Sequence, residues 1–136
     1  MRFSRKERHL GTSVEIMVET DLPDVSEALD AAYAHFRSVE REFSRFRDDS
    51  SLSVLNREGR IRASDRFLLL LNESRSAHSA TGGLFNPLVD VSRLGYSKSF
   101  DSGEFVAVDR GLSTDFGAVS TNGRTVSVEP GHALDF

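Results

Sequence analysis

The chain of 136 residues contains no cysteine, and this absence removes several classes of chemistry at once. Without thiols there is no disulfide, no thiolate zinc site, no cysteine nucleophile and no lipidated cysteine. Long apolar runs are also missing. The basic start, residues 1–8, is followed by no stretch that could form a signal-peptide core or a membrane helix. The chain is therefore expected to be cytoplasmic, without a membrane segment.

Clustered charge and familiar catalytic groupings are absent as well. The formal net charge is −4 with Lys and Arg interspersed among the acids, so we expect no nucleic-acid partner. The four histidines lack the paired spacing of metal ligands, and no serine lies in a Gly-x-Ser-x-Gly motif. The histidines are therefore expected to be hydrogen-bonded within the fold or to face solvent, and the residues themselves indicate no catalytic group and no metal site.

Periodic apolar residues predict two helices. Asp24 can cap the first, with Glu27 three residues on as in a capping box, and apolar residues then recur at three- and four-residue steps through Phe46. The second is predicted from Ser64 to about Ala80, and a glycine pair at positions 82 and 83 would end it.

Alternating apolar residues predict strands. Residues 12–18 show the pattern of a half-buried strand, and 104–108 and 125–128 are further candidates. Asn122 and Gly123 suit a type I′ hairpin turn, because both tolerate positive φ. The fold class predicted is α+β, with helices packed on a mostly antiparallel sheet.

The length of the chain predicts a single domain over residues 1–136, with a disordered leader over residues 1–9. The sequence ends abruptly in the apolar stretch 133–136, without a polar tail or a helix stop. We therefore expect the chain to be a truncated form of a larger fold, and its penultimate residue, Asp135, to be frayed.

Four segments in chain order carry a resemblance to a known family. They are Leu10-Gly11-Thr12-Ser13-Val14, Ser44-Arg45-Phe46-Arg47-Asp48-Asp49-Ser50-Ser51-Leu52-Ser53-Val54-Leu55-Asn56, Thr81-Gly82-Gly83-Leu84-Phe85-Asn86-Pro87 and Ala133-Leu134-Asp135-Phe136. Their order and spacing resemble those of the FAD:protein FMN transferases, the ApbE family. The resemblance is to the amino-terminal portion only, and it implies a truncated, T-fold-like α+β domain.

The resemblance also implies a set of flavin-contacting residues. The counterpart of Phe46 lies against the flavin ring in the family, and an aromatic face is suited to such stacking. The other positions border the flavin or bind its nucleotide, and the full set is Leu10, Phe46, Leu84, Phe85, Asn86 and Asp135. No catalytic residue and no metal ligand is assigned, because the family's magnesium ligands would lie in a carboxyl-terminal half beyond residue 136.

The residues alone leave other interpretations open. By periodicity Phe46 is the last core residue of the first helix, and Leu10 belongs to an ordinary strand entry. The glycine pair with Asn86 can be a helix cap followed by a turn. Asn56 and the serines at positions 50, 51 and 53 are predicted to cap turns and helices rather than to contact a ligand.

The function implied by the resemblance is magnesium-dependent transfer of FMN from FAD to a threonine hydroxyl of a partner flavoprotein, in a full-length form. The alternative is a non-catalytic remnant that binds flavin or a partner, and a third possibility is a purely structural domain. The sequence identifies neither the acceptor protein nor the oligomeric state.

Overall fold

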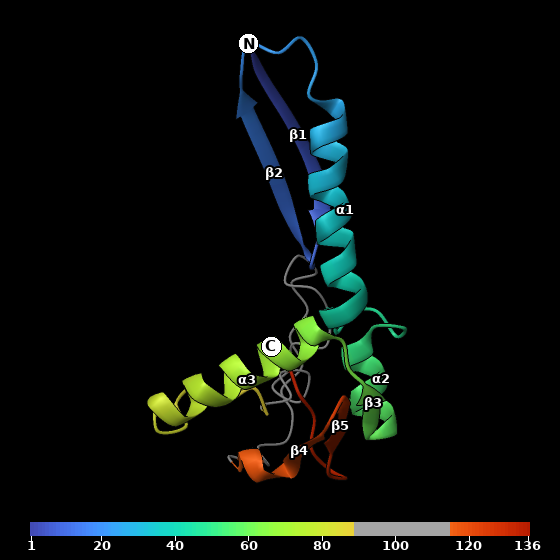
Figure 1. The fold of residues 1–136 in the computed structure, drawn as a ribbon, viewed down its shortest axis with the longest axis vertical. Coiled ribbons are helices and arrows are strands. Elements are labelled where there is room, and N and C mark those ends of the chain that lie inside the picture. The colour runs from blue at the N-terminus through green and yellow to red at the C-terminus, as the bar shows by residue number, and fades with distance from the viewer. Residues whose placement is uncertain (89–114) are drawn as a thin grey trace, which may run out of the picture.

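A computed structural model describes residues 1–88 and 115–136, and Figure 1 shows them as an upright arm above a broader lower body. The arm consists of β1 (Arg2–His9), β2 (Thr12–Glu19) and α1 (Ser26–Phe43). The lower body consists of α2 (Ser51–Glu58), β3 (Arg60–Arg62), α3 (Asp65–Ala80), the 3₁₀ turn Phe116–Ala118, β4 (Val119–Asn122) and β5 (Thr125–Val128). Both sheets are antiparallel, in the orders β1-β2 and β3-β5-β4, so the predicted α+β class is confirmed.

The arm is a β-hairpin packed on a long helix. β1 and β2 pair along their whole lengths, and the apolar residues of β2 that the alternation predicts to be half-buried are half-buried. The prediction of a disordered leader over residues 1–9 is wrong, because Arg2–His9 form β1. Polar residues conceal this strand in the sequence: Arg5, Glu7 and His9 alternate onto its less exposed face, where apolar residues usually stand.

The two hairpin turns differ. In the first, Leu10 and Gly11 both have positive φ, 50° and 74°, as a type I′ turn requires. In the second, the predicted Asn122-Gly123 turn is displaced by one residue, because Asn122 pairs with Thr125 within the ladder. Gly123 is then the first loop residue, and its φ of 57° gives the φ pattern of a type II′ turn.

Both predicted helices are present, but the first begins and ends at other residues than predicted. Val25 is the N-cap of α1, and Asp24 instead accepts a hydrogen bond from the N–H of Ser26 at 2.9 Å, so the predicted capping box is wrong. The helix ends at Phe43, three residues before Phe46. The second helix, α3, is confirmed, with the Ser64 hydroxyl oxygen accepting the N–H of Phe67 at 3.0 Å.

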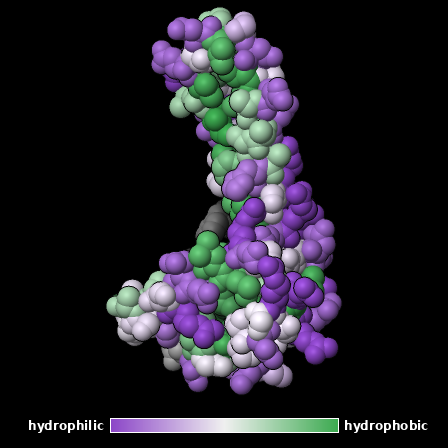
Figure 2. All heavy atoms as spheres, in the orientation of Figure 1, coloured by the Kyte–Doolittle hydropathy of each residue, from purple (hydrophilic) through white to green (hydrophobic). Residues whose placement is uncertain are grey.

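The apolar core lies in the lower body. Its buried members come from α2, α3, the 3₁₀ turn, the small sheet, the segments that flank α3 and the last residues. They are Leu52, Leu55, Ala63, Phe67, Leu71, Leu88, Phe116, Val119, Val126, Val128 and Leu134. Phe43, in the last turn of α1, packs on this core: its ring centroid lies 5.5 Å from that of Phe67 and 6.0 Å from that of Phe136. The arm is therefore joined to the lower body by aromatic packing, near the narrow junction visible in Figure 2.

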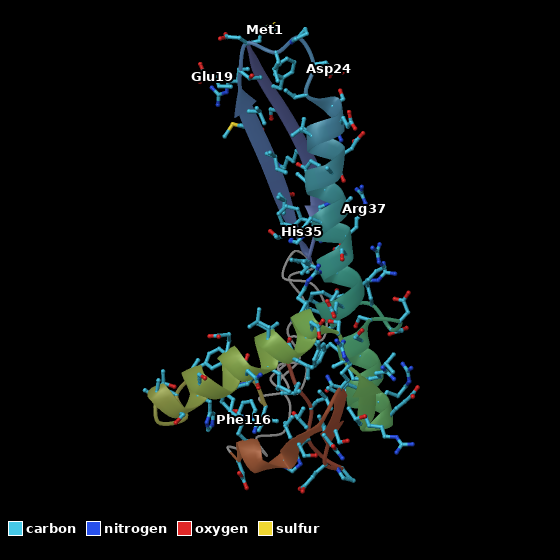
Figure 3. All side chains as sticks on the ribbon, in the orientation of Figure 1. Met1, Glu19, Asp24, His35, Arg37 and Phe116 are labelled. Atoms are coloured by element: carbon cyan, nitrogen blue, oxygen red, sulfur yellow. The ribbon has the colours of Figure 1, made fainter. Side chains whose placement is uncertain are left out.

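Figure 3 shows the side chains: Met1, Glu19 and Asp24 lie at the far end of the arm, and Phe116 lies in the lower body. The strand predicted over residues 104–108 lies outside the described residues. The single-domain interpretation remains a prediction. Over residues 1–88 and 115–136, no helix combines the length and the hydrophobicity needed to span a bilayer.

Candidate functional site

A cavity of about 550 Å³ lies where the arm meets the lower body. The tip of the first hairpin, the end of α1, the loop after it, α3 and the last two residues all contribute to its wall. Its lining residues are Leu10, Val39, Phe43, Ser44, Arg45, Phe46, Leu70, Asn86, Asp135 and Phe136. Six of these are apolar and four are polar, which is the composition expected of a small-molecule site with a few orienting groups.

Phe46 lies in the loop after α1 and contributes an aromatic face to the cavity. It is 39% exposed, so the interpretation of Phe46 as a core residue of the helix is wrong. The loop is held locally, because the N–H of Phe46 donates to the Ser44 hydroxyl oxygen at 3.3 Å. The guanidinium carbon of Arg45 lies 4.5 Å from the centre of the Phe46 ring, a cation–π contact within the cavity wall.

Asp135 faces the same cavity and is fixed from two sides. Its N–H donates to the carbonyl of Pro87 at 2.8 Å, and one carboxylate oxygen lies 3.6 Å from Nε of Arg45. The expectation that Asp135 is frayed is therefore wrong. The ion pair with Arg45 places one positive and one negative group beside an aromatic ring.

Asn56 explains why the segment before Asp135 is ordered. Its side-chain amide pairs with the backbone of Leu134, donating to the carbonyl at 2.8 Å and accepting from the N–H at 2.8 Å. Ser50 is buried and caps α2 by accepting the N–H of Ser53 at 3.1 Å. The predicted capping role is confirmed for Ser50. Asn56 has a different structural role, because its amide holds a distant backbone segment instead of capping a turn or a helix.

In the segment Thr81–Pro87, one predicted site residue lines the cavity and two are exposed to solvent. Asn86 lines the cavity, although its side-chain oxygen also accepts the N–H of Leu88 at 3.1 Å, as in a turn. Leu84 is 92% exposed and Phe85 is 43% exposed, and neither lines the cavity. Four of the six residues of the predicted site, Leu10, Phe46, Asn86 and Asp135, therefore share one cavity, and a ligand contact of Leu84 and Phe85 remains a prediction.

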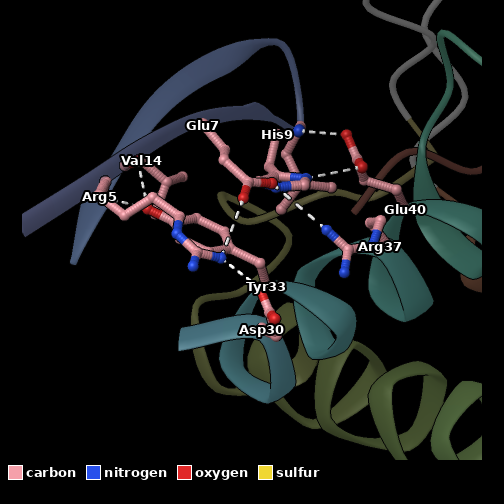
Figure 4. A network of polar contacts seen from close by, with 9 residues as sticks. Arg5, Glu7, His9, Val14, Asp30, Tyr33, Arg37 and Glu40 are labelled. Carbon is pink, nitrogen blue, oxygen red and sulfur yellow. Dashed lines mark hydrogen bonds and ion pairs between the residues drawn. The ribbon is translucent and has the colours of Figure 1, made fainter. Parts of the chain in front are cut away.

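The hairpin tip is tied to α1 by a polar network (Figure 4). The carboxylate of Glu40 accepts the N–H of Leu10 at 2.7 Å and lies 2.9 Å from Nδ1 of His9. Burial by itself raises the pKa of Glu40, but the hydrogen bonds from His9 and Leu10, with the charges of His9 and Arg47, outweigh it and hold that pKa below its ordinary value. Glu40 is therefore stabilised in its charged form.

Sequence reasoning missed Arg45, Glu40 and His9. The position of Arg45 between Ser44 and Phe46, inside the resembling segment, was a signal for it. No local pattern joins His9 to Glu40, because 31 residues separate them in the chain. In the described part of the chain, no three His, Asp or Glu side chains are grouped as a metal site requires, so the structure identifies no residue here that would hold magnesium.

The fold and the cavity together define an α+β protein with a candidate site for a small, partly apolar ligand. Solved structures that share the fold include ApbE proteins from three organisms. The ApbE protein from Thermotoga maritima is 17% identical with a TM-score of 0.81, and the match covers 99% of this chain and 47% of that one. The flavin transferase ApbE from Vibrio cholerae is 18% identical with a TM-score of 0.74, covering 99% and 48%.

The flavinyl transferase ApbE from Pseudomonas stutzeri is 14% identical with a TM-score of 0.75, covering 100% of this chain and 49% of that one. No match is found among curated proteins. The model of the ApbE family matches residues 10–104, so the chain belongs to the ApbE family. It spans about half the length of the solved structures that it resembles.

Proposed function

We propose that this chain supplies the isoalloxazine-binding part of an FAD:protein FMN transferase. The observation that carries the proposal is the cavity, whose wall combines the partly exposed ring of Phe46 with apolar residues and the Arg45–Asp135 pair. An aromatic face in an apolar cleft favours a flat conjugated ring, and the polar pair can orient its heteroatoms. Membership of the ApbE family and the names of the similar structures support flavin as that ligand.

The full reaction would transfer FMN from FAD to a threonine hydroxyl of a partner flavoprotein. The hydroxyl oxygen attacks the FMN phosphorus, the pyrophosphate bond breaks, AMP leaves, and the hydroxyl proton passes to a base. Magnesium would neutralise charge on the phosphates, with ligands from outside the described residues. The contribution of this chain would be to bind and orient the flavin, with Phe46 against the ring and Leu10 closing one side.

A second candidate function is flavin binding without transfer. Two observations favour it: the cavity is formed by this chain itself, whereas its described residues contain no grouping of three metal-ligating side chains. AMP release from FAD in the presence of magnesium and a threonine-bearing flavoprotein would separate the two candidates. Binding with AMP release indicates a transferase, and binding without it indicates the non-catalytic form.

The proposal is tested by titrating the purified chain with FAD, with and without magnesium, and following flavin fluorescence. Binding against Phe46 should change the flavin fluorescence, because it alters the surroundings of the ring, and Phe46→Ala should weaken binding about fivefold to tenfold. Phe46→Tyr keeps the ring and should bind as the parent chain does. Leu22→Ala removes an exposed apolar side chain between β2 and α1 and serves as the matched control. A folded chain that leaves FAD fluorescence unchanged contradicts the proposal.

A further inference from the structure

Leu10 has an unusual backbone conformation at the cavity. Its φ of 50° lies in the left-handed region, and within residues 1–88 and 115–136 no other non-glycine residue has a positive φ. For a residue with a Cβ atom this conformation is disfavoured, and type I′ turns prefer Asn, Asp or Gly at this position. Gly11 suits the second position of the turn, but Leu10 does not suit the first, so a contact from elsewhere in the chain is needed to stabilise its conformation.

The stabilising contact comes from Glu40 on α1. One carboxylate oxygen accepts the N–H of Leu10 at 2.7 Å, and the other lies 2.9 Å from Nδ1 of His9. With both oxygens engaged, the carboxylate has little freedom to rotate away. Hydrogen bonds to a charged acceptor are about twice as strong as neutral ones, so this contact can offset the conformational cost at Leu10.

His9 is itself held firmly. Its side chain is buried, its ring stacks on those of Tyr33 and Phe36 at centroid distances of 5.5 and 5.6 Å, and Nε2 lies 3.2 Å from a carboxylate oxygen of Glu7. Arg37 in turn lies 3.3 Å from the same oxygen of Glu7. Figure 4 shows this chain of contacts running from α1 through the hairpin to the turn.

We infer that Glu40 is a positioning residue, which holds Leu10 in the left-handed conformation and so fixes the apolar side of the cavity against which a flavin ring lies. The neighbouring helix residue, Val39, lines the same cavity, so the hairpin tip and α1 are joined directly at the site. The effect on ligand affinity rests on the proposed function. The effect on the turn does not.

The experiment compares Glu40→Ala and Glu40→Gln with the parent chain by amide hydrogen exchange and the ¹⁵N–¹H spectrum, and then by FAD titration. Glu40→Ala should speed exchange of the Leu10 amide about tenfold or more, move its proton resonance upfield, and raise the Kd for FAD about fivefold. Glu40→Gln keeps an acceptor oxygen and should recover most of the protection and affinity. Glu27→Gln removes one carboxylate from the exposed first turn of α1 and is the matched control.

Each outcome decides the inference. An unchanged Leu10 amide in a folded Glu40→Ala chain would overturn it, and so would a lost amide protection without any change in the Kd for FAD. A parent chain that does not bind FAD contradicts the proposed function, while the amide of Leu10 still shows whether Glu40 holds the turn. If Glu40→Ala fails to fold, Glu40→Gln still tests the inference: an amide oxygen is a weaker acceptor than a carboxylate, so the Leu10 amide should keep most of its protection yet exchange measurably faster than in the parent chain.

Discussion

The side-chain amide of Asn56 links two backbone segments that are far apart in the sequence. The Asn56 amide and the Leu134 backbone are separated by 78 residues, and their two hydrogen bonds form a closed pair like that between adjacent strands. Leu134 is buried, so its N–H and carbonyl would have no access to water if the amide were removed. This side chain therefore helps to order the residues that carry Asp135 into the cavity, together with the contacts of Asp135 with Pro87 and Arg45.

Replacing Asn56 by alanine should lower the free energy of unfolding by about 1 to 3 kcal/mol, because it leaves a buried donor and a buried acceptor unpaired. Urea denaturation followed by circular dichroism measures the change. Asn72→Ala, at an exposed position of α3, is the matched control and should change little. Faster exchange of the Leu134 amide should accompany the loss, and equal stability of the two variants would contradict the assigned role of Asn56.

Among the secondary-structure elements, α1 contacts both strands of the hairpin through one buried aromatic residue, in addition to the polar network at the hairpin tip. Tyr33 is fully buried, and its hydroxyl donates to the carbonyl of Arg5 in β1 and to that of Val14 in β2, the latter at 3.1 Å. A single hydroxyl thus contacts both strands. A two-stranded hairpin is marginally stable alone, so packing on a helix stabilises the arm, and the Tyr33 hydroxyl is one of the contacts that attach it.

Tyr33→Phe keeps the ring and removes the hydroxyl, and it should cost about 1 to 2 kcal/mol of unfolding free energy. The loss should be local. Amides of β1 and β2 should exchange faster, while those of α3 in the same molecule act as the internal reference. Equal acceleration in the arm and in α3 would indicate a global loss of stability rather than a loosened hairpin.

The elements were predictable where their patterns are local. α3 has its cap and its apolar residues in one continuous segment, and residues 12–18 alternate as a strand should. β1 was not predictable, because Arg5, Glu7 and His9 occupy its inner face and find their partners on α1 and in the hairpin. The candidate site was likewise predictable only where a local segment carries it. Phe46 and Asp135 lie in segments that resemble the family, and both line the cavity. The contact of Glu40 with the hairpin tip depends on the tertiary fold and has no local pattern.

Among the described residues, the arm and the lower body meet where α1 ends, and the candidate site lies there. Phe43 at the end of α1 packs on Phe67 and Phe136, which joins the arm to the apolar core. Glu40 in turn holds the hairpin tip against α1 beside the same cavity. A change in the charge of Glu40 should therefore be felt in the stability of the molecule and in the geometry of its site together.

The lowered pKa of Glu40 predicts a specific dependence of stability on pH. Its ordinary value is 4.5, and the folded protein holds it lower, so the unfolded chain binds the proton more readily. The stabilisation from the carboxylate is therefore complete above pH 4.5 and is lost as the pH falls through the folded-state pKa. Unfolding free energies of the parent chain and of Glu40→Gln, measured by urea denaturation from about pH 6 to pH 3.5, should differ by a constant amount at the upper end and converge at the lower.

Asp24 and Asp49 also have lowered pKa values, but both proteins share them, so their contribution cancels in the difference. A difference that grows on acidification would mean that Glu40 binds its proton more tightly in the folded state, and that its pairing with His9 and Leu10 does not favour the charged form.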